Sequence, residues 1–302
     1  MTIALVFFAH TGLVVAAVLI AGRRAWQRVS AVLILIGCFI LEWFAPVDLV
    51  SRTLLTGGGM IALMATVRNA SLATERWTVW QRLFHLIFLG HPMRAESAKP
   101  WLWQRALAHL VLDALVCGAA ILALRHLTPA HYVSRWAVGV VLLCALGHFL
   151  LEGLPRFCFS VAGASMNTIH RTPIAASSLR DFWGRRWNCM VSGWLNTFIF
   201  LPLARRHRPG LGLCCAFLMS AAMHAWLVVG LGALAAFSMA MFFSLQSLFI
   251  WVEDHLCVKT WPAPLARAWT LIVLLGLSPL IVIQRGSLGW PMCFRRWQIR
   301  HD

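Results

Sequence analysis

Long apolar runs separated by short, basic, polar stretches dominate this chain. A run of about 18 or more apolar residues can cross the roughly 30 Å hydrocarbon core of a bilayer as a helix. Hydropathy predicts such spans near residues 3–21, 31–47, 53–67, 103–124, 136–154, 190–203, 211–230, 233–252 and 268–285. Because 190–203 is short for a full crossing, the pattern predicts an all-α integral membrane protein with eight or nine transmembrane helices.

The basic residues between the apolar runs predict the topology of the first half of the chain. Arginines follow the first span, recur through residues 68–100 and follow the fifth span. The positive-inside rule places these three stretches in the cytoplasm and the N-terminus outside. The second half stays open. If 190–203 crosses the membrane, the basic tail at 295–302 lies inside; if it re-enters, the basic stretch at 204–210 lies inside.

One polar stretch also has helical spacing. Residues 76–92, RWTVWQRLFHLIFLGHP, place aromatic and aliphatic side chains near a helical repeat that basic residues interrupt. This pattern is typical of a helix that lies in the membrane interface. No repeat or linker divides the chain, so we expect a single multi-pass domain over residues 1–302, with a motif-bearing core at about 155–256.

Composition agrees with the hydropathy pattern. The chain is 60% hydrophobic and 12% charged, whereas soluble domains average about 25% charged residues. A net charge of +16 would point to nucleic acid in a soluble protein. Here the basic residues lie between spans, which indicates contact with anionic membrane lipids and no nucleic-acid partner. Nearly all of them are arginine, which suggests a GC-rich genome and a bacterial cytoplasmic membrane.

Ionisable residues inside spans are candidates for function, because burying them in lipid is costly. His224 is the only strongly polar side chain in the apolar run 211–230. It is either satisfied by a neighbouring backbone carbonyl or acts as a general base.

Two further pairs have helical i, i+4 spacing: His109 with Asp113, and His148 with Glu152. Each pair could form its own hydrogen-bonded couple with a structural use. Together the two pairs could instead form a proton relay or a metal site between spans, as in a proton-coupled membrane transporter. The dense histidine boxes of membrane di-iron enzymes are absent, so we expect no bound metal.

The stretch 177–188, SSLRDFWGRRWN, is polar and aromatic between two apolar runs. Arg and Trp side chains commonly anchor the end of a span at the headgroup level. An anchor does not account for Asp181 or Asn188, which add hydrogen-bonding groups.

SSLRDFWGRRWN resembles the S-L-x-D-F-W-G-R-R-W-N motif of the wax synthases of plants and their bacterial and fungal relatives. These proteins form a branch of the membrane-bound O-acyltransferase (MBOAT) superfamily. FLMSAAMHAWLVVG, with His224, is similar to the apolar helix that carries the family's histidine. A third likeness is MFFSLQSLFIWVEDHL at 241–256. Many relatives have an acidic residue after the histidine, where this chain has Ala225.

The resemblance implies a bundle of tilted helices around an intramembrane tunnel, with acyl-CoA as co-substrate and no bound cofactor. Acyl-CoA would enter from the cytoplasmic side, and the acceptor would be a lipophilic alcohol or another hydroxyl compound. His224 would be the general base, and Asn188 would orient the thioester or stabilise the oxyanion. The expected CoA-binding residues are Arg185, Arg186, Trp183, Trp187 and Asp181. A non-catalytic MBOAT relative remains an alternative.

Overall fold

The computed structural model describes residues 2–22, 24–71, 102–128, 130–161 and 168–282, which contain helices and no strand. Seven of the described helical segments are long and apolar enough to cross a membrane. Many of their large apolar side chains point outward; Leu115 and Ile272 are 66% and 67% exposed. Such surfaces suit lipid, so the protein is an all-α, multi-pass integral membrane protein.

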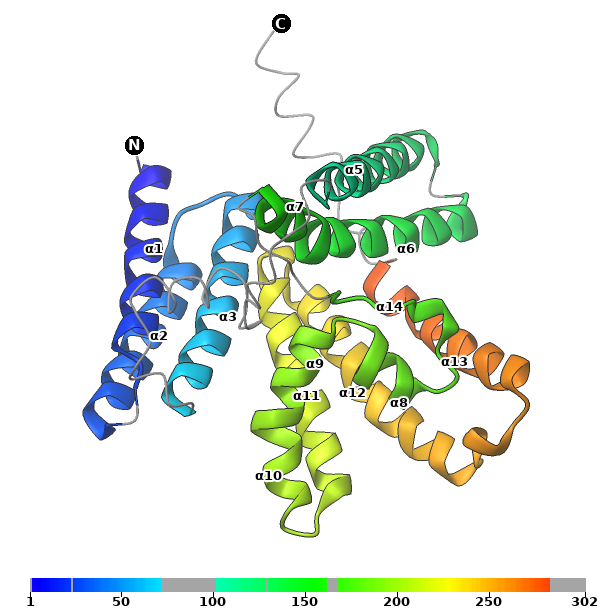
Figure 1. The fold of residues 1–302 in the computed structure, drawn as a ribbon. Coiled ribbons are helices and arrows are strands. Elements are labelled where there is room, and N and C mark those ends of the chain that lie inside the picture. The colour runs from blue at the N-terminus through cyan, green and yellow to red at the C-terminus, as the bar shows by residue number, and fades with distance from the viewer. Residues whose placement is uncertain (1, 23, 72–101, 129, 162–167, 283–302) are drawn as a thin grey trace, which may run out of the picture.

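The first three helices form a bundle on one side of the molecule (Figure 1). They are α1 (Thr2–Ile20), α2 (Ala25–Phe44) and α3 (Leu49–Ser71). Small and branched side chains fill the space between them, with Val18, Leu35 and Cys38 buried at the centre. Close packing of this kind, rather than water exclusion, holds helices together inside a bilayer.

A second group lies across the upper part of the view in Figure 1. It consists of α5 (Leu102–His126), α6 (Tyr132–His148) and α7 (Leu154–Val161), with a π-helical turn at Phe149–Gly153 between α6 and α7. α6, the turn and α7 form one continuous apolar segment from Tyr132 to Val161.

In the third group of helices, the motif at residues 177–188 packs against two long helices. The motif forms the short α8 (Leu179–Asp181) and a π-helical turn at Phe182–Arg186, followed by α9 (Cys189–Leu195), a second π-helical turn at Asn196–Phe200 and α10 (Leu201–Ala204). The long helices are α11 (Pro209–Leu227) and α12 (Ala233–His255), and α13 (Ala263–Leu277) and α14 (Pro279–Val282) complete the group. π-helical turns are rare and are frequent at functional sites.

The observed helices match most of the predicted spans. The seven apolar helical segments cover seven of the nine predicted runs. The run at 53–67 lies in α3, which is long enough but is not among the seven, and 190–203 forms the short apolar segment Cys189–Ala204. The predicted interfacial helix at 76–92 and the tail at 295–302 lie outside the described residues.

Candidate functional site

His224 lies near the C-terminal end of α11, and its ring is held in a defined state. Its Nδ1 donates a hydrogen bond to the carbonyl oxygen of Ser220 at 2.8 Å. A carbonyl can only accept, so Nδ1 carries the ring proton and Nε2 keeps a free lone pair whenever the imidazole is neutral. This is the tautomer that a general base needs.

Aromatic rings connect His224 to the motif. The imidazole stacks on Phe243 of α12, with ring centroids 3.9 Å apart. Phe243 in turn contacts the indole of Trp183, at 5.5 Å between centroids. The Trp183 N–H donates to the side-chain oxygen of Gln246 at 3.0 Å. Trp183 thus packs against α12, on the same Phe243 ring on which His224 stacks.

A buried glutamate fixes the start of the motif. Glu253 of α12 is fully buried, and its Oε2 accepts the backbone N–H of Leu179 at 2.7 Å. The Leu179 side chain is also fully buried, in a cluster with Phe217 and Ile250. Ser178 caps α8 through the N–H of Asp181. The first turn of the motif is therefore held by hydrogen bonds and by packing.

The two arginines of the motif have different environments. Arg186 donates from Nε to Asp181 at 2.6 Å and lies 3.4 Å from the carbonyl oxygens of Arg171 and Thr172. Arg185 is exposed, and no described residue forms an ion pair with it. Arg186 therefore stabilises the motif itself, whereas the exposed Arg185 guanidinium has no ion-pair partner within the described part of the chain.

Asn188 has an unusual backbone conformation, and its side-chain oxygen is hydrogen-bonded. Its φ of 43° is in the left-handed region, which Asn tolerates better than most residues. Its side-chain oxygen caps α9 by accepting the N–H of Val191 at 3.3 Å. Val191 packs on a cluster that contains Met223, the neighbour of His224. Asn188 and His224 thus lie on helices that pack together, although no hydrogen bond joins these two described residues.

A second buried glutamate holds the segment before the motif. Glu152 accepts the Arg156 guanidinium at 2.6 Å, the backbone N–H of His170 at 2.8 Å and its Nδ1 at 3.0 Å. This segment pairs with the motif, because Arg171 N–H donates to the carbonyl of Arg186 at 2.8 Å. The His170 ring also contacts Trp187 edge-on, at 4.8 Å between centroids. Glu152 therefore supports the motif from the side of α6 and α7.

The structure corrects the predicted histidine couples. Asp113 does not pair with His109, which is exposed; it accepts from Nδ1 of His148 at 2.7 Å, across the contact between α5 and α6. His148 Nε2 lies 4.0 Å from Glu152, as the helical spacing allowed. The local couple of His109 with Asp113 is therefore wrong, whereas Asp113 and His148 meet between two spans, as the alternative that joined the two pairs had placed them.

Three possible metal ligands meet in this network. His148, Glu152 and His170 each place one ligand atom within 4.8 Å of the others. The Glu152 carboxylate, however, already accepts one guanidinium, one imidazole and the backbone N–H groups of Ile169 and His170. These donors use its lone pairs, so hydrogen bonding alone accounts for the cluster.

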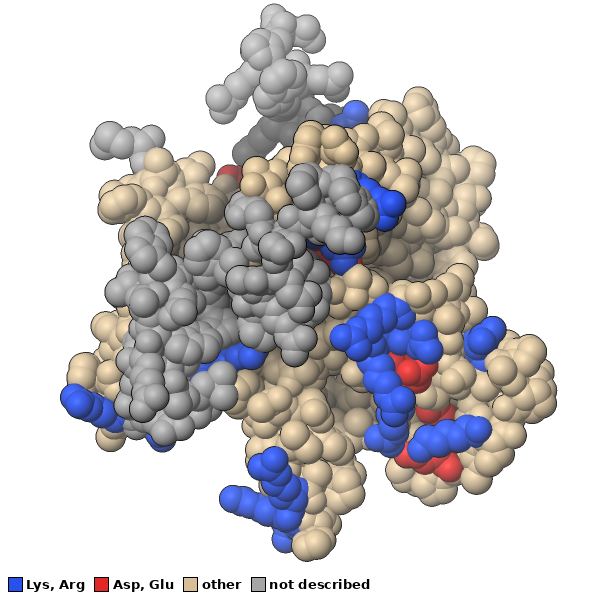
Figure 2. Space-filling model, viewed as in Figure 1, with Lys and Arg blue, Asp and Glu red and all other residues tan. Residues whose placement is uncertain are grey.

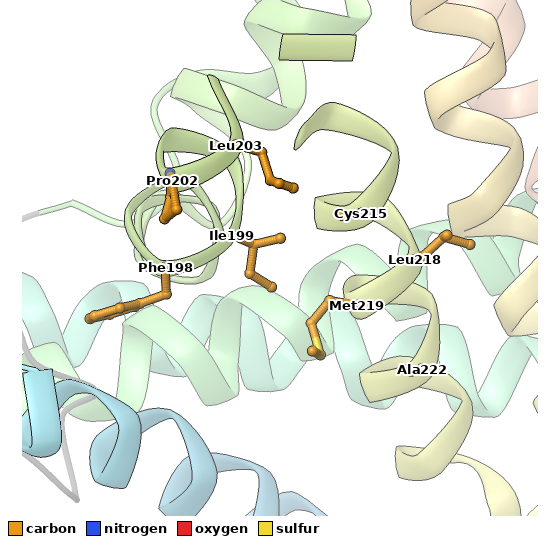
Figure 3. Close-up of a pocket in the computed structure, with 8 residues that line it drawn as sticks. All are labelled: Phe198, Ile199, Pro202, Leu203, Cys215, Leu218, Met219 and Ala222. Carbon is orange, nitrogen blue, oxygen red and sulfur yellow. The ribbon is translucent and has the colours of Figure 1, made fainter. Parts of the chain in front are cut away.

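An apolar cavity of about 530 Å³ lies beside α11 but away from His224. Its α11 wall is Cys215, Leu218, Met219 and Ala222, and the other wall comes from Phe198, Ile199, Pro202 and Leu203 (Figure 3). Successive residues of an α-helix are about 100° apart around the axis. His224 therefore points about 160° away from Ala222, so this cavity is on the opposite face of α11 from the imidazole.

Comparisons with known proteins match the region just described. Residues 166–245 match the membrane bound O-acyl transferase family. "Probable long-chain-alcohol O-fatty-acyltransferase 3" of Arabidopsis thaliana is 32% identical over 108 residues, which are 33% of this chain and 31% of that protein. "Long-chain-alcohol O-fatty-acyltransferase" of Simmondsia chinensis is 30% identical over 111 residues, 37% of this chain and 25% of that protein.

A third relative is similar over a shorter stretch. "Probable long-chain-alcohol O-fatty-acyltransferase 2" of Arabidopsis thaliana is 42% identical over 55 residues, 18% of this chain and 16% of that protein. The matches thus span less than a third of the length of each relative. The region that carries the motif and His224 is thus similar to the membrane-bound O-acyltransferase superfamily, in its wax synthase-like branch.

Proposed function

We propose that this protein transfers an acyl group from acyl-CoA to the hydroxyl of a lipophilic alcohol, with His224 as the general base. The observation that carries the proposal is the hydrogen bond from His224 Nδ1 to the Ser220 carbonyl, which leaves Nε2 free to accept a proton. The relatives' names, long-chain-alcohol O-fatty-acyltransferases, supply the reaction class and the acceptor.

The reaction needs one proton acceptor that later returns the proton. Nε2 of His224 takes the hydroxyl proton while the alcohol oxygen attacks the thioester carbonyl carbon. The carbon–sulfur bond then breaks, and the CoA thiolate takes the proton from the imidazolium. The products are the ester and free CoA, and His224 is neutral again. The Asn188 amide would donate to the oxyanion, a type of contact worth about 3–4 kcal/mol when it is preorganised.

The charged surface beside the motif suits the polar end of acyl-CoA. Figure 2 shows basic and acidic side chains together over α8 and the end of α12. Asp181 and Asp254 engage Arg186 and Arg180, and Arg185 remains open to phosphate oxygens. We place this surface on the cytoplasmic side, where CoA is available, and the arginine-rich composition favours a bacterial membrane. Trp187 would border the entrance beside it.

The test is an assay of purified protein in lipid nanodiscs with long-chain acyl-CoA and long-chain alcohols. We expect wild type to release free CoA and form ester in equal amounts, and His224→Ala to lose about a hundredfold or more in rate. His255→Ala is the matched control, because His255 makes the same Nδ1 bond to the carbonyl four residues earlier, 2.8 Å from Trp251, yet is exposed. Ester formation that survives in His224→Ala would overturn the assignment of the base.

A further inference from the structure

The N-terminal bundle contains a buried pair of polar side chains, His10 and Glu42, that the proposed reaction does not use. Glu42 of α2 is fully buried, and His10 of α1 is 4% exposed. His10 Nε2 donates to Glu42 Oε1 at 2.8 Å. We call these two residues the His10–Glu42 dyad. Burying such ionisable side chains inside a membrane costs free energy, so we looked for the contacts that explain their position.

The other carboxylate oxygen of Glu42 reaches the helix of the proposed base. Trp226 of α11 donates its indole N–H to Glu42 Oε2 at 2.8 Å, across 184 positions of sequence. The same indole stacks on Trp43 and meets Phe39 edge-on, with centroids 5.8 and 5.4 Å away. Both oxygens of Glu42 are thus used, one for each partner.

The backbone of α3 is shaped to admit this dyad. A Cβ at Gly59 would overlap with Glu42 Oε1, and a Cβ at Gly58 would lie 3.1 Å from the His10 ring. Glycines weaken a helix by about 1 kcal/mol each relative to alanine. Their presence in the middle of α3 lets the carboxylate lie against the helix backbone.

Trp226 follows His224 by two residues, so the two side chains point about 160° apart around α11. His224 stacks on Phe243 of α12, whereas Trp226 is bound to α2 on the other side. A rotation of the last turn of α11 that kept one contact would break the other. The turn is also held by the 3.4 Å bond from Thr56 to the carbonyl of Leu227.

We propose that Glu42, supported by His10, is a positioning residue that fixes the rotation of the last turn of α11 through Trp226 and so aims the His224 imidazole. The inference rests on the proposed function for its kinetic consequence. It gives the N-terminal bundle, which lies outside the region matched by the family, a defined role in the site.

The first test compares Trp226 with Trp136, which also donates its indole N–H to a side chain of another segment. Trp226→Phe should lower kcat by about tenfold, because small displacements of a reacting group are costly, while KM for acyl-CoA changes by less than about twofold. Trp136→Phe, which removes the 2.7 Å bond to Ser278, should lose comparable stability and keep its kcat. Equal kcat values for Trp226→Phe and wild type, per folded molecule, would overturn the proposal, as would an equal fall in both variants.

Substitutions at the dyad separate hydrogen bonding from charge. Glu42→Gln keeps an oxygen for the indole and should retain most of the kcat, whereas Glu42→Leu should match Trp226→Phe. An equal loss in Gln and Leu would rule out the hydrogen bond as the anchor. If Trp226→Phe does not fold, the milder His10→Ala decides: a lower kcat at unchanged KM supports the proposal, and full kcat overturns it.

A readout that needs no substrate separates this inference from the proposed function. Diethyl pyrocarbonate modifies the imidazole, and mass spectrometry of the peptide that contains His224 gives its rate. We expect a rate that rises about threefold or more in Trp226→Phe and stays unchanged in Trp136→Phe. If wild type transfers no acyl group but the labelling differs as stated, the function fails and the positioning role stands. Equal labelling in all three proteins would overturn the positioning role.

Discussion

The carboxylate of Glu253 accepts the backbone N–H of Leu179 at 2.7 Å and so joins α12 to the first turn of the motif, 74 positions earlier. α12 also carries Phe243, the ring on which His224 stacks. One helix therefore sets the position of the motif and of the proposed base at the same time. This shared support explains how the polar motif stays in register with the histidine of α11.

Loss of the Glu253 clamp should disturb the site more than loss of its neighbour. Glu253→Ala leaves the buried N–H of Leu179 without its acceptor, which costs about 1–3 kcal/mol, and we expect acyl transfer to fall by about tenfold or more. Asp254→Ala is the control, because Asp254 forms exposed pairs with Arg180 and Lys259 and such pairs contribute about 1 kcal/mol or less. CoA release by the two variants, per folded molecule, makes the comparison; equal activities would contradict the clamp.

Asn188 has two separable properties, a helix cap and an amide donor. Asp preserves the cap on Val191 and tolerates the positive φ, but it has no N–H to donate. If the amide stabilises the oxyanion, Asn188→Asp should unfold at the wild-type temperature yet lose about a hundredfold in kcat. A normal kcat in this variant would leave Asn188 with the cap alone.

Arg185 and Arg186 should fail in different ways. Arg185→Ala should raise KM for acyl-CoA, and more so at low ionic strength, because an exposed guanidinium acts through screened charge. Arg186→Ala should instead lower the unfolding temperature, since Arg186 binds Asp181. Arg205→Ala, an exposed arginine in the turn between α10 and α11, is the control for net charge. A salt-independent KM in Arg185→Ala would speak against phosphate binding.

The sequence predicts the class of fold well, because membrane insertion is governed by long apolar runs. The spans at 103–124, 211–230 and 233–252 correspond directly to α5, α11 and α12. The bounds of α3 were less visible, since Arg52 and three successive glycines lower its hydropathy. Arg52 is satisfied by the carbonyl oxygens at the end of α2, a tertiary contact that hydropathy does not encode.

The sequence predicts a site residue only where a polar side chain interrupts an apolar run. His224 and the motif stood out as polar groups beside or within apolar runs. The roles of Glu42 and Glu253 are not visible in the sequence, because the partners of these two residues lie 184 and 74 positions away. Both are nevertheless acidic residues in or beside a predicted span. The sign that could have found them is an acidic residue in an apolar helix with no base at helical spacing.

Loss of Glu152, which lies outside the motif, should cost much stability. Its carboxylate binds Arg156, His170 and the backbone of residues 169–170, so Glu152→Leu leaves a half-buried guanidinium and two N–H groups without an acceptor. Breaking a buried pair on one side costs about 3–5 kcal/mol. We expect the unfolding temperature to fall clearly and acyl transfer to be lost in parallel. Tryptophan fluorescence of the protein in detergent measures the unfolding temperature. His109→Leu, a change at an exposed histidine of α5, should leave both unchanged. A transporter built on these residues would instead lose activity in both variants. A Glu152→Leu protein that is as stable as wild type and retains acyl transfer would contradict the support role of Glu152.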